Sequence, residues 1–170
     1  MNIFKTIDTN IGNKLTTNNS KLSFVISLFS YIGSVFSVFV FLAFILICCS
    51  KKIYLLESIC SLFYATLIVF ILKFTVKRKR NTCNIDKIRQ KIDPYSFPSG
   101  HISRIFASIS PFYNIPYVTV TTFVLAGLTS IARINKGYHY FSDCFVGMLC
   151  GITSSFIAKI TLKYLQTFLQ

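Results

Sequence analysis

With 170 residues, the chain has the length of about one domain. Apolar residues make up 53% of it and charged residues only 14%, and its mean hydropathy of +0.60 excludes an ordinary soluble domain and favours a membrane protein. The 18 Lys and Arg outnumber the five acids, for a net charge of +13. Because the basic residues adjoin long apolar runs, this excess indicates contact with anionic lipid headgroups or a phosphorylated substrate, and not with nucleic acid. For several of them, loop charge that only sets the membrane topology is the simpler interpretation.

The chain begins with a polar segment. Residues 1–21 carry Asn, Thr and Lys, and they lack a small-residue cleavage site before the first apolar run, which is too long for the core of a signal peptide. We therefore expect an uncleaved lead-in that is interfacial or loosely ordered, followed by one membrane-embedded domain over residues 22–170.

Residues 22–49 form the first apolar run, and the run contains no charge. As one helix its 28 residues would be about 42 Å long, against a hydrocarbon core of roughly 30 Å. A Gly-Ser pair is a natural break in such a run, so we predict that Gly33 and Ser34 divide it. The two expected helices are near 22–32 and 34–49.

Further apolar runs follow, and we expect each to be a helix: 53–76, 102–113, 117–134 and 141–165. Together they predict an all-α, polytopic membrane bundle of about six helices, with an active site at one membrane face. Glu57 lies inside a predicted span but only five residues after Lys52, so we expect it at the membrane interface. The loop at 77–100, which is charged over 77–95, is separated from the loop at 135–142 by two passes through the membrane, so both should emerge on one side.

The six cysteines show no Cys-x-x-Cys or Cys/His ligand spacing, so a structural zinc site is not expected. Four of them lie in apolar runs, where a buried thiol behaves as a small hydrophobic group. Cys83 and Cys144 lie near the predicted loops and would be able to pair outside the cytoplasm, but we expect free thiols.

A short polar motif, Pro98-Ser99-Gly100-His101, lies between the charged loop and the next apolar run. Proline and serine are typical of a helix start, and glycine lets a ligand approach the backbone closely. The first N–H groups of a helix have no partner within it, and the helix dipole adds partial positive charge, so this place suits an anion. His101 would then be able to protonate a leaving oxygen. Plain helix capping is the alternative interpretation of the motif alone.

Other ionisable residues lie close to the predicted helix ends on the same side. Lys73 and Arg80 are seven residues apart, and they would share one face and clamp phosphate oxygens if the helix continues to Arg80. Arg133 adds a cation for charge that develops on a phosphoryl group. His139 precedes Asp143 by four residues, so the carboxylate would orient one ring nitrogen and leave the other as a nucleophile or base.

Each of these residues also has a purely structural interpretation. Lys73 would extend its side chain to the interface, Arg133 would anchor a helix end, and His139 with Asp143 would form a surface pair. Taken together these interpretations are weak, because the few ionisable groups flank helix ends that must face one compartment.

The three groups of residues together resemble the signature of the type 2 phosphatidic acid phosphatase superfamily, K-x6-R-P, P-S-G-H and S-R-x5-H-x3-D. Here the signature reads Lys73-x6-Arg80-Asn81, Pro98-Ser99-Gly100-His101 and Ala132-Arg133-x5-His139-x3-Asp143. Asn81 replaces the family's proline and Ala132 its serine. These two departures affect a turn and one hydroxyl, but they remove no catalytic group.

The resemblance implies a metal-independent reaction on a lipid phosphate, with no cofactor. His139 would attack phosphorus to give a phosphohistidine, Asp143 would orient it, and His101 would protonate the leaving lipid oxygen. The phosphate would be held by the remaining matched residues, Lys73, Arg80, Ser99, Gly100 and Arg133. The sequence has no cluster of carboxylates near these positions, which agrees with a reaction that needs no metal.

The small size of the chain resembles that of bacterial undecaprenyl-diphosphate phosphatases, so a polyprenyl diphosphate is the first predicted substrate. Phosphatidic acid, phosphatidylglycerol phosphate and a lipid A phosphate stay open. So do two other functions: a lipid phosphotransferase with the same site, and a non-catalytic membrane protein that binds anionic lipid through its basic loop. The resemblance implies a site on the extracytoplasmic face of the cell membrane, whereas the charged 77–91 loop favours the cytoplasm. The sequence predicts no oligomeric state.

Overall fold

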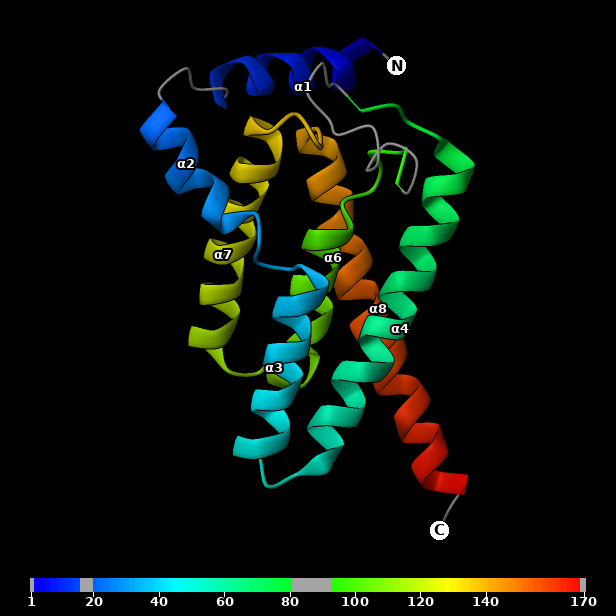
Figure 1. The fold of residues 1–170 in the computed structure, drawn as a ribbon. Coiled ribbons are helices and arrows are strands. Elements are labelled where there is room, and N and C mark those ends of the chain that lie inside the picture. The colour runs from blue at the N-terminus through cyan, green and yellow to red at the C-terminus, as the bar shows by residue number, and fades with distance from the viewer. Residues whose placement is uncertain (1, 16–19, 81–92, 169–170) are drawn as a thin grey trace.

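The computed structural model describes residues 2–15, 20–80 and 93–168, and in them the chain is mainly helical. That part of the chain contains seven α-helices and one short 3-10 turn, η1 (Figure 1). The all-α class is therefore confirmed. The bounds are α1 Asn2–Leu15, α2 Ser20–Phe29, α3 Val35–Cys48, α4 Lys52–Val76, α6 Gly100–Ser108, η1 Ser110–Phe112, α7 Pro116–Asn135 and α8 Phe141–Phe168.

Three of the described helices, α4, α7 and α8, are long and apolar enough to cross a membrane. α3 is a shorter apolar helix, and α2 precedes it along the same descending path in Figure 1. Large apolar side chains on the outside of the bundle are exposed, among them Phe36, Ile47 and Phe63. Such a surface is expected where helices meet lipid.

The predicted break in the first apolar run is confirmed at Gly33 and Ser34. The Ser34 side chain caps α3 by accepting a hydrogen bond of 3.2 Å from the Ser37 N–H. Gly33 has a φ of +73°, and a Cβ there would lie 2.4 Å from the His101 carbonyl oxygen. Because only glycine fits this turn, the break between α2 and α3 rests directly on the first turn of α6.

Small residues allow α8 to approach its neighbours closely. A Cβ at Gly147 would lie 2.5 Å from the Ser99 carbonyl oxygen, and one at Gly151 would lie 2.5 Å from the Ser103 carbonyl oxygen. Both glycines are therefore required where α6 packs, while buried serine side chains join α4 to the same helix. This packing fixes the motif at 98–101 against the start of α8.

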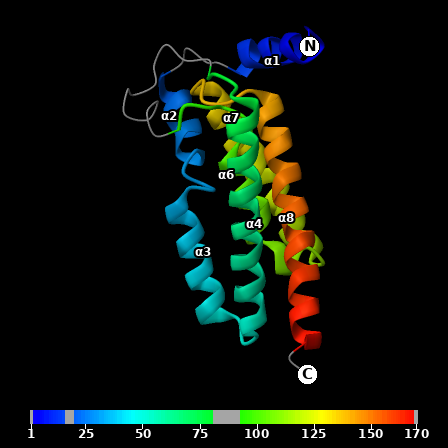
Figure 2. The same cartoon turned by 90° about the vertical axis from the view of Figure 1, so that its right-hand side faces the viewer.

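α1 lies across one end of the bundle, where it packs against α7 and α8 (Figures 1 and 2). It forms from residues of the predicted polar lead-in, so much of that segment is helical. The segments 77–80 and 93–99 and the turn 136–140 lie at this same end, where Arg80 donates a hydrogen bond to the Tyr138 carbonyl. The two predicted loops thus emerge on one side, as expected.

The cysteines in the described part of the chain are free thiols, as predicted: Cys48, Cys49, Cys60, Cys144 and Cys150. Cys144 belongs to the hydrophobic core around Phe106 and behaves there as a small apolar group. Cys83, which we considered as its partner, lies outside the described residues.

Candidate active site

A cavity of about 200 Å³ collects residues from all three predicted motifs. Its walls come from α4, from the start of α6, from the end of α7 and from the segments beside them. The lining residues are Thr66, Val69, Phe70, Lys73, Asp93, Gly100, His101, Arg104, Arg133 and His139. Both predicted catalytic histidines and two of the predicted phosphate-binding cations therefore share one cavity.

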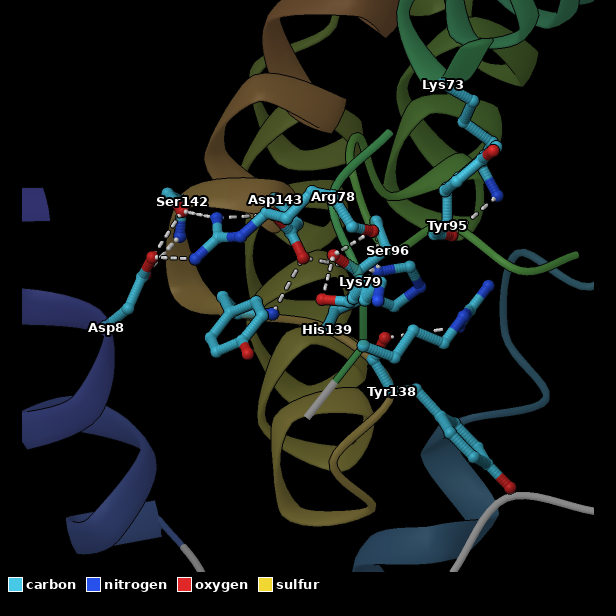
Figure 3. Close-up of polar contacts among 12 residues, drawn as sticks. Asp8, Lys73, Arg78, Lys79, Tyr95, Ser96, Tyr138, His139, Ser142 and Asp143 are labelled. Atoms are coloured by element: carbon cyan, nitrogen blue, oxygen red, sulfur yellow. Dashed lines mark hydrogen bonds and ion pairs between the residues drawn. The ribbon is translucent and has the colours of Figure 1, made fainter. Parts of the chain in front are cut away.

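His139 lies in the turn between α7 and α8 and is buried. Its Nδ1 lies 2.7 Å from the carbonyl oxygen of Ser96, which can only accept a hydrogen bond, so Nδ1 carries the proton (Figure 3). Burial, together with the charges of Arg133 and Arg80, lowers the pKa of His139 to about 4, although Asp143 acts in the opposite direction. The ring is therefore neutral at pH 7, and Nε2 keeps a lone pair.

His101 is the second residue of α6 and lines the same cavity. Its Nδ1 lies 3.4 Å from a terminal guanidinium nitrogen of Arg104, three residues further along the helix. Arg104 is itself fixed by a 2.8 Å hydrogen bond from its Nε to the Gly33 carbonyl. The break between α2 and α3 thus helps to place the side chains beside His101, and both imidazoles border one space.

Asp143 is fully buried in the first turn of α8. Its Oδ2 lies 3.8 Å from His139 Nδ1 and accepts a 2.9 Å hydrogen bond from the Tyr140 N–H. Its Oδ1 accepts one of 2.9 Å from Arg78, and its main-chain carbonyl accepts one of 2.9 Å from the Ser99 N–H. Asp143 therefore lies within ion-pair range of the imidazole and joins the second motif to the third. The direct hydrogen bond of the ring goes to a main-chain carbonyl.

Lys73 and Arg80 are brought together by a shared partner, and not by the predicted helix face. α4 ends at Val76, where Lys77 adopts a left-handed conformation with a φ of 50°, so the prediction of one continuous helix face is wrong. Instead, the carboxylate of Asp93 bridges the cations, 2.5 Å from Lys73 Nζ and 2.6 Å from Arg80. Burial raises the pKa of Asp93, but the hydrogen bonds and charges of both cations outweigh it and hold the pKa below its usual range.

The turn after α7 fixes two of the predicted phosphate-binding arginines. Arg80 donates a 3.1 Å hydrogen bond to the Tyr138 carbonyl, and the Arg133 guanidinium lies over the Tyr138 ring, 4.6 Å from its centroid. Both arginine side chains are buried. Their charges therefore act in surroundings of low dielectric constant, where they attract an anion more strongly than in water.

Ser99 and Gly100 form the start of α6. Ser99 occupies the N-cap position and is fully buried, but its side chain makes no capping hydrogen bond. The first intrahelical hydrogen bond runs from the Ser103 N–H to the Ser99 carbonyl, so the amides of residues 100–102 precede it. A Cβ at Gly100 would lie 3.4 Å from a nitrogen of Arg104, at the cavity wall. A helix N-terminus and several cations therefore meet at one place, which suits a phosphate.

Sequence reasoning misses four charged residues at this end: Asp8, Arg78, Asp93 and Arg104. Arg104 has a local signal, because it lies three residues after His101 and so on the same helix face. Arg78 is one of four consecutive basic residues, and nothing in that run distinguishes it. The two acids reach the site only through the tertiary structure.

Comparisons with known proteins identify a family and two similar structures. The sequence profile of the PAP2 superfamily matches residues 52–166. Among curated proteins, none has a sequence that matches this chain significantly. The crystal structure of Aquifex aeolicus LpxE is similar with a TM-score of 0.73 and 24% identity, covering 89% of this chain and 93% of that one. That of a transmembrane PAP2-type phosphatidylglycerolphosphate phosphatase from Bacillus subtilis is similar with a TM-score of 0.75 and 19% identity, covering 96% and 88%.

The two structural likenesses establish the fold. The profile match begins at α4 and continues into the last turns of α8, so it contains the cavity and all three motifs. It also covers more than half of the chain and therefore establishes the family. The chain belongs to the PAP2 superfamily and is a multi-pass membrane lipid phosphatase.

Proposed function

We propose that this phosphatase hydrolyses the terminal phosphate of a polyprenyl diphosphate through a phosphohistidine on His139. The observation that carries the proposal is the cavity in which His139 and His101 lie together with Lys73 and Arg133. A neutral imidazole whose Nδ1–H donates a hydrogen bond to the Ser96 carbonyl has its lone pair on Nε2, as a nucleophile requires.

The proposed reaction has two steps. In the first, the Nε2 lone pair of His139 attacks the terminal phosphorus, the bond to the bridging oxygen breaks, and His101 gives that oxygen a proton as the lipid leaves. In the second, His101 takes a proton from water, the water oxygen attacks phosphorus, and phosphate leaves Nε2. The Asp143 carboxylate, 3.8 Å from Nδ1, stabilises the positive imidazole of the intermediate.

We assign phosphate binding to Lys73, Arg80, Ser99, Gly100 and Arg133. The planar guanidinium groups suit pairs of phosphate oxygens, and the lysine acts as a point charge. The carboxylate of Asp93 already contacts Lys73 and Arg80, so a substrate phosphate competes with it for these cations. The amides at the start of α6 supply uncharged donors.

Two features of the cavity support a polyprenyl diphosphate. Its α4 wall is lined by Thr66, Val69 and Phe70, and Phe70 is 58% exposed, so the wall continues onto the surface that meets lipid. The lining holds three cations and one carboxylate, and this positive excess favours two phosphate groups over one. Phosphatidylglycerol phosphate, which is the substrate named for the Bacillus subtilis relative, is an alternative, as are phosphatidic acid and a lipid A phosphate.

The experiment is phosphate release by the purified full chain in detergent micelles, across a panel of these lipids. We expect polyprenyl diphosphate to be hydrolysed fastest, and His139→Ala to lose on the order of 10³-fold or more of the rate. Thr75→Ala is the matched control, because Thr75 is exposed near the end of α4 and, within the described residues, its side chain bonds only to carbonyls of its own helix. An unchanged rate in His139→Ala would exclude the nucleophile.

The same panel tests the substrate and the reaction type separately. Faster turnover of a glycerophospholipid would replace the proposed substrate while leaving the mechanism in place. A terminally labelled lipid distinguishes hydrolysis from transfer, since a phosphotransferase moves the label to an acceptor other than water. Hydrolysis is expected, with the label recovered as inorganic phosphate.

We also propose that the site opens on the extracytoplasmic face of the cell membrane. Lys73, Arg78 and Arg80 are paired with carboxylates, so their charges are compensated and do not count fully as topology signals. Single cysteines at the exposed positions Lys77 and Lys51, in a chain without native thiols, test this. A membrane-impermeant thiol reagent added to intact cells should label Lys77→Cys and spare Lys51→Cys. The reverse pattern would place the site in the cytoplasm.

A further inference from the structure

The helix α1 contributes one side chain to the interior of the site end. Among residues 6–15 of this helix, Asp8 is the only buried one, with 3% of its surface exposed. An amphipathic helix at a membrane surface normally buries apolar side chains. A carboxylate in that place requires compensating partners, because an unpaired buried charge is very costly.

Asp8 has such partners on two other elements. Its Oδ2 lies 2.6 Å from Arg78 and accepts a 2.7 Å hydrogen bond from the Ser142 hydroxyl, while its Oδ1 accepts one of 3.0 Å from the Ser142 N–H (Figure 3). Ser142 is in the first turn of α8, where main-chain N–H groups have no partner within the helix. Asp8 therefore caps the helix that carries Asp143, although it comes from a distant part of the chain.

Arg78 connects Asp8 to Asp143 at the centre of the site. One terminal nitrogen binds Asp8, and the other lies 2.9 Å from Asp143 Oδ1 and 2.7 Å from the Ser142 hydroxyl. The guanidinium also lies over the Tyr140 ring, 3.8 Å from its centroid. A planar fork held on one face and at both ends has little freedom, so the position of Asp8 restricts the position of Asp143.

We propose that Asp8 is a positioning residue for the phosphatase reaction, acting through Arg78 on Asp143. Asp8 touches neither the cavity nor the reacting atoms, and its contribution is to hold Arg78 and the first turn of α8 so that Asp143 stays beside His139. This inference rests on the proposed function, because it takes Asp143 as the group that stabilises the phosphorylated imidazole. α1 is then part of the active enzyme.

The simpler alternative is that Asp8 only attaches α1 to the bundle. Asp8→Asn distinguishes the two, because asparagine has the same shape and can still accept from Ser142, but it has no charge for Arg78. We expect kcat to fall about 10- to 100-fold, the effect of a small displacement in a catalytic group, while KM changes little because no phosphate-binding residue is altered. Asn10→Ala, at an exposed position of the same helix, is the control and should keep the wild-type kcat.

A double-mutant cycle identifies the route of the effect. If Asp8 acts through Arg78, adding Asp8→Asn to Arg78→Gln should reduce kcat by less than twofold beyond the single arginine variant. Thermal unfolding of each variant is followed in parallel, so that a loss of folded protein is not counted as a loss of kcat. A wild-type kcat in folded Asp8→Asn, or a full 10-fold loss on the Arg78→Gln background, would overturn the inference. Because His139→Ala is assayed separately, either result leaves the proposed function standing.

Discussion

In the part of this apolar bundle that the structure describes, charged side chains pair at both ends. At the far end from α1, Glu57 of α4 accepts a 2.7 Å hydrogen bond from Ser110 and lies 3.7 Å from Lys159 of α8. Glu57 and Lys159 form one matched pair, and the neighbouring cavity of about 300 Å³ is lined mainly by apolar and aromatic side chains. At the α1 end, three cations and one carboxylate line the cavity of the site.

The two clusters differ in their balance of positive and negative charges. A matched acid and base satisfy each other, and such a pair holds helices together without needing a ligand. Cations in excess around a cavity in a low-dielectric bundle attract an anion. Activity should therefore depend steeply on charges of the α1 end and hardly at all on those of the far end.

The largest effect is expected for Arg133→Ala. Arg133 is buried, lies over Tyr138 and lines the cavity, so its charge is fixed where charge develops on the transferring phosphoryl group. Removing such a preorganised group costs on the order of 10²- to 10³-fold in kcat. Steady-state phosphate release measures this, with Lys163→Ala, an exposed cation of α8, as the control. Equal rates for the two variants would mean that the cations of the cavity do not act on the transition state.

Much of this site follows from sequence because its spacing is local. Pro98 to His101 must begin a helix, and His139 and Asp143 are four residues apart across a helix start, so their approach needs little tertiary information. The break at Gly33 follows from the length of an uncharged run against the thickness of a membrane. These parts of the prediction are confirmed by the positions of α3, α6 and α8.

The remainder depends on contacts between distant segments. Lys77 ends α4 in a left-handed conformation that is uncommon for lysine, and no local pattern announces it. Lys73 and Arg80 therefore do not share a helix face. Asp93, which comes later in the chain, joins them by contacting both. In the sequence, Asp8 cannot be distinguished from the other polar residues of the lead-in, because its burial depends on where α1 lies in the fold. The hydrogen bond from His139 to Ser96 uses a main-chain carbonyl, which every residue has, so no residue type in the sequence predicts it.

The second effect is expected for Gly147→Ala, at the end that carries the site. A Cβ at Gly147 would lie 2.5 Å from the Ser99 carbonyl oxygen, so α8 must move away from the start of α6. Overpacking of this kind costs about 1–3 kcal/mol in stability, and displaced catalytic groups should reduce kcat about 10-fold or more.

Gly127→Ala is the matched control, because no atom of the described residues lies within 4 Å of a Cβ at that position of α7. Alanine is a better helix former than glycine by about 0.5–1 kcal/mol, so this control should unfold at the same or a higher temperature. Thermal unfolding and kcat are measured on both variants. Similar behaviour in the two would show that the close approach of α6 and α8 does not position the site.

The smallest effect is expected for Glu57→Gln, at the far end. The amide oxygen of glutamine can still accept the hydrogen bond from Ser110, and only the weak pairing with Lys159 at 3.7 Å is lost. A partly exposed ion pair contributes about 0–1 kcal/mol, so the unfolding temperature should change little and kcat less than about twofold. Phosphate release measured beside Arg133→Ala makes the comparison direct. If Glu57→Gln lost activity on the scale of Arg133→Ala while remaining folded, charge at the far end would also act on catalysis, and the division between the two clusters would be wrong.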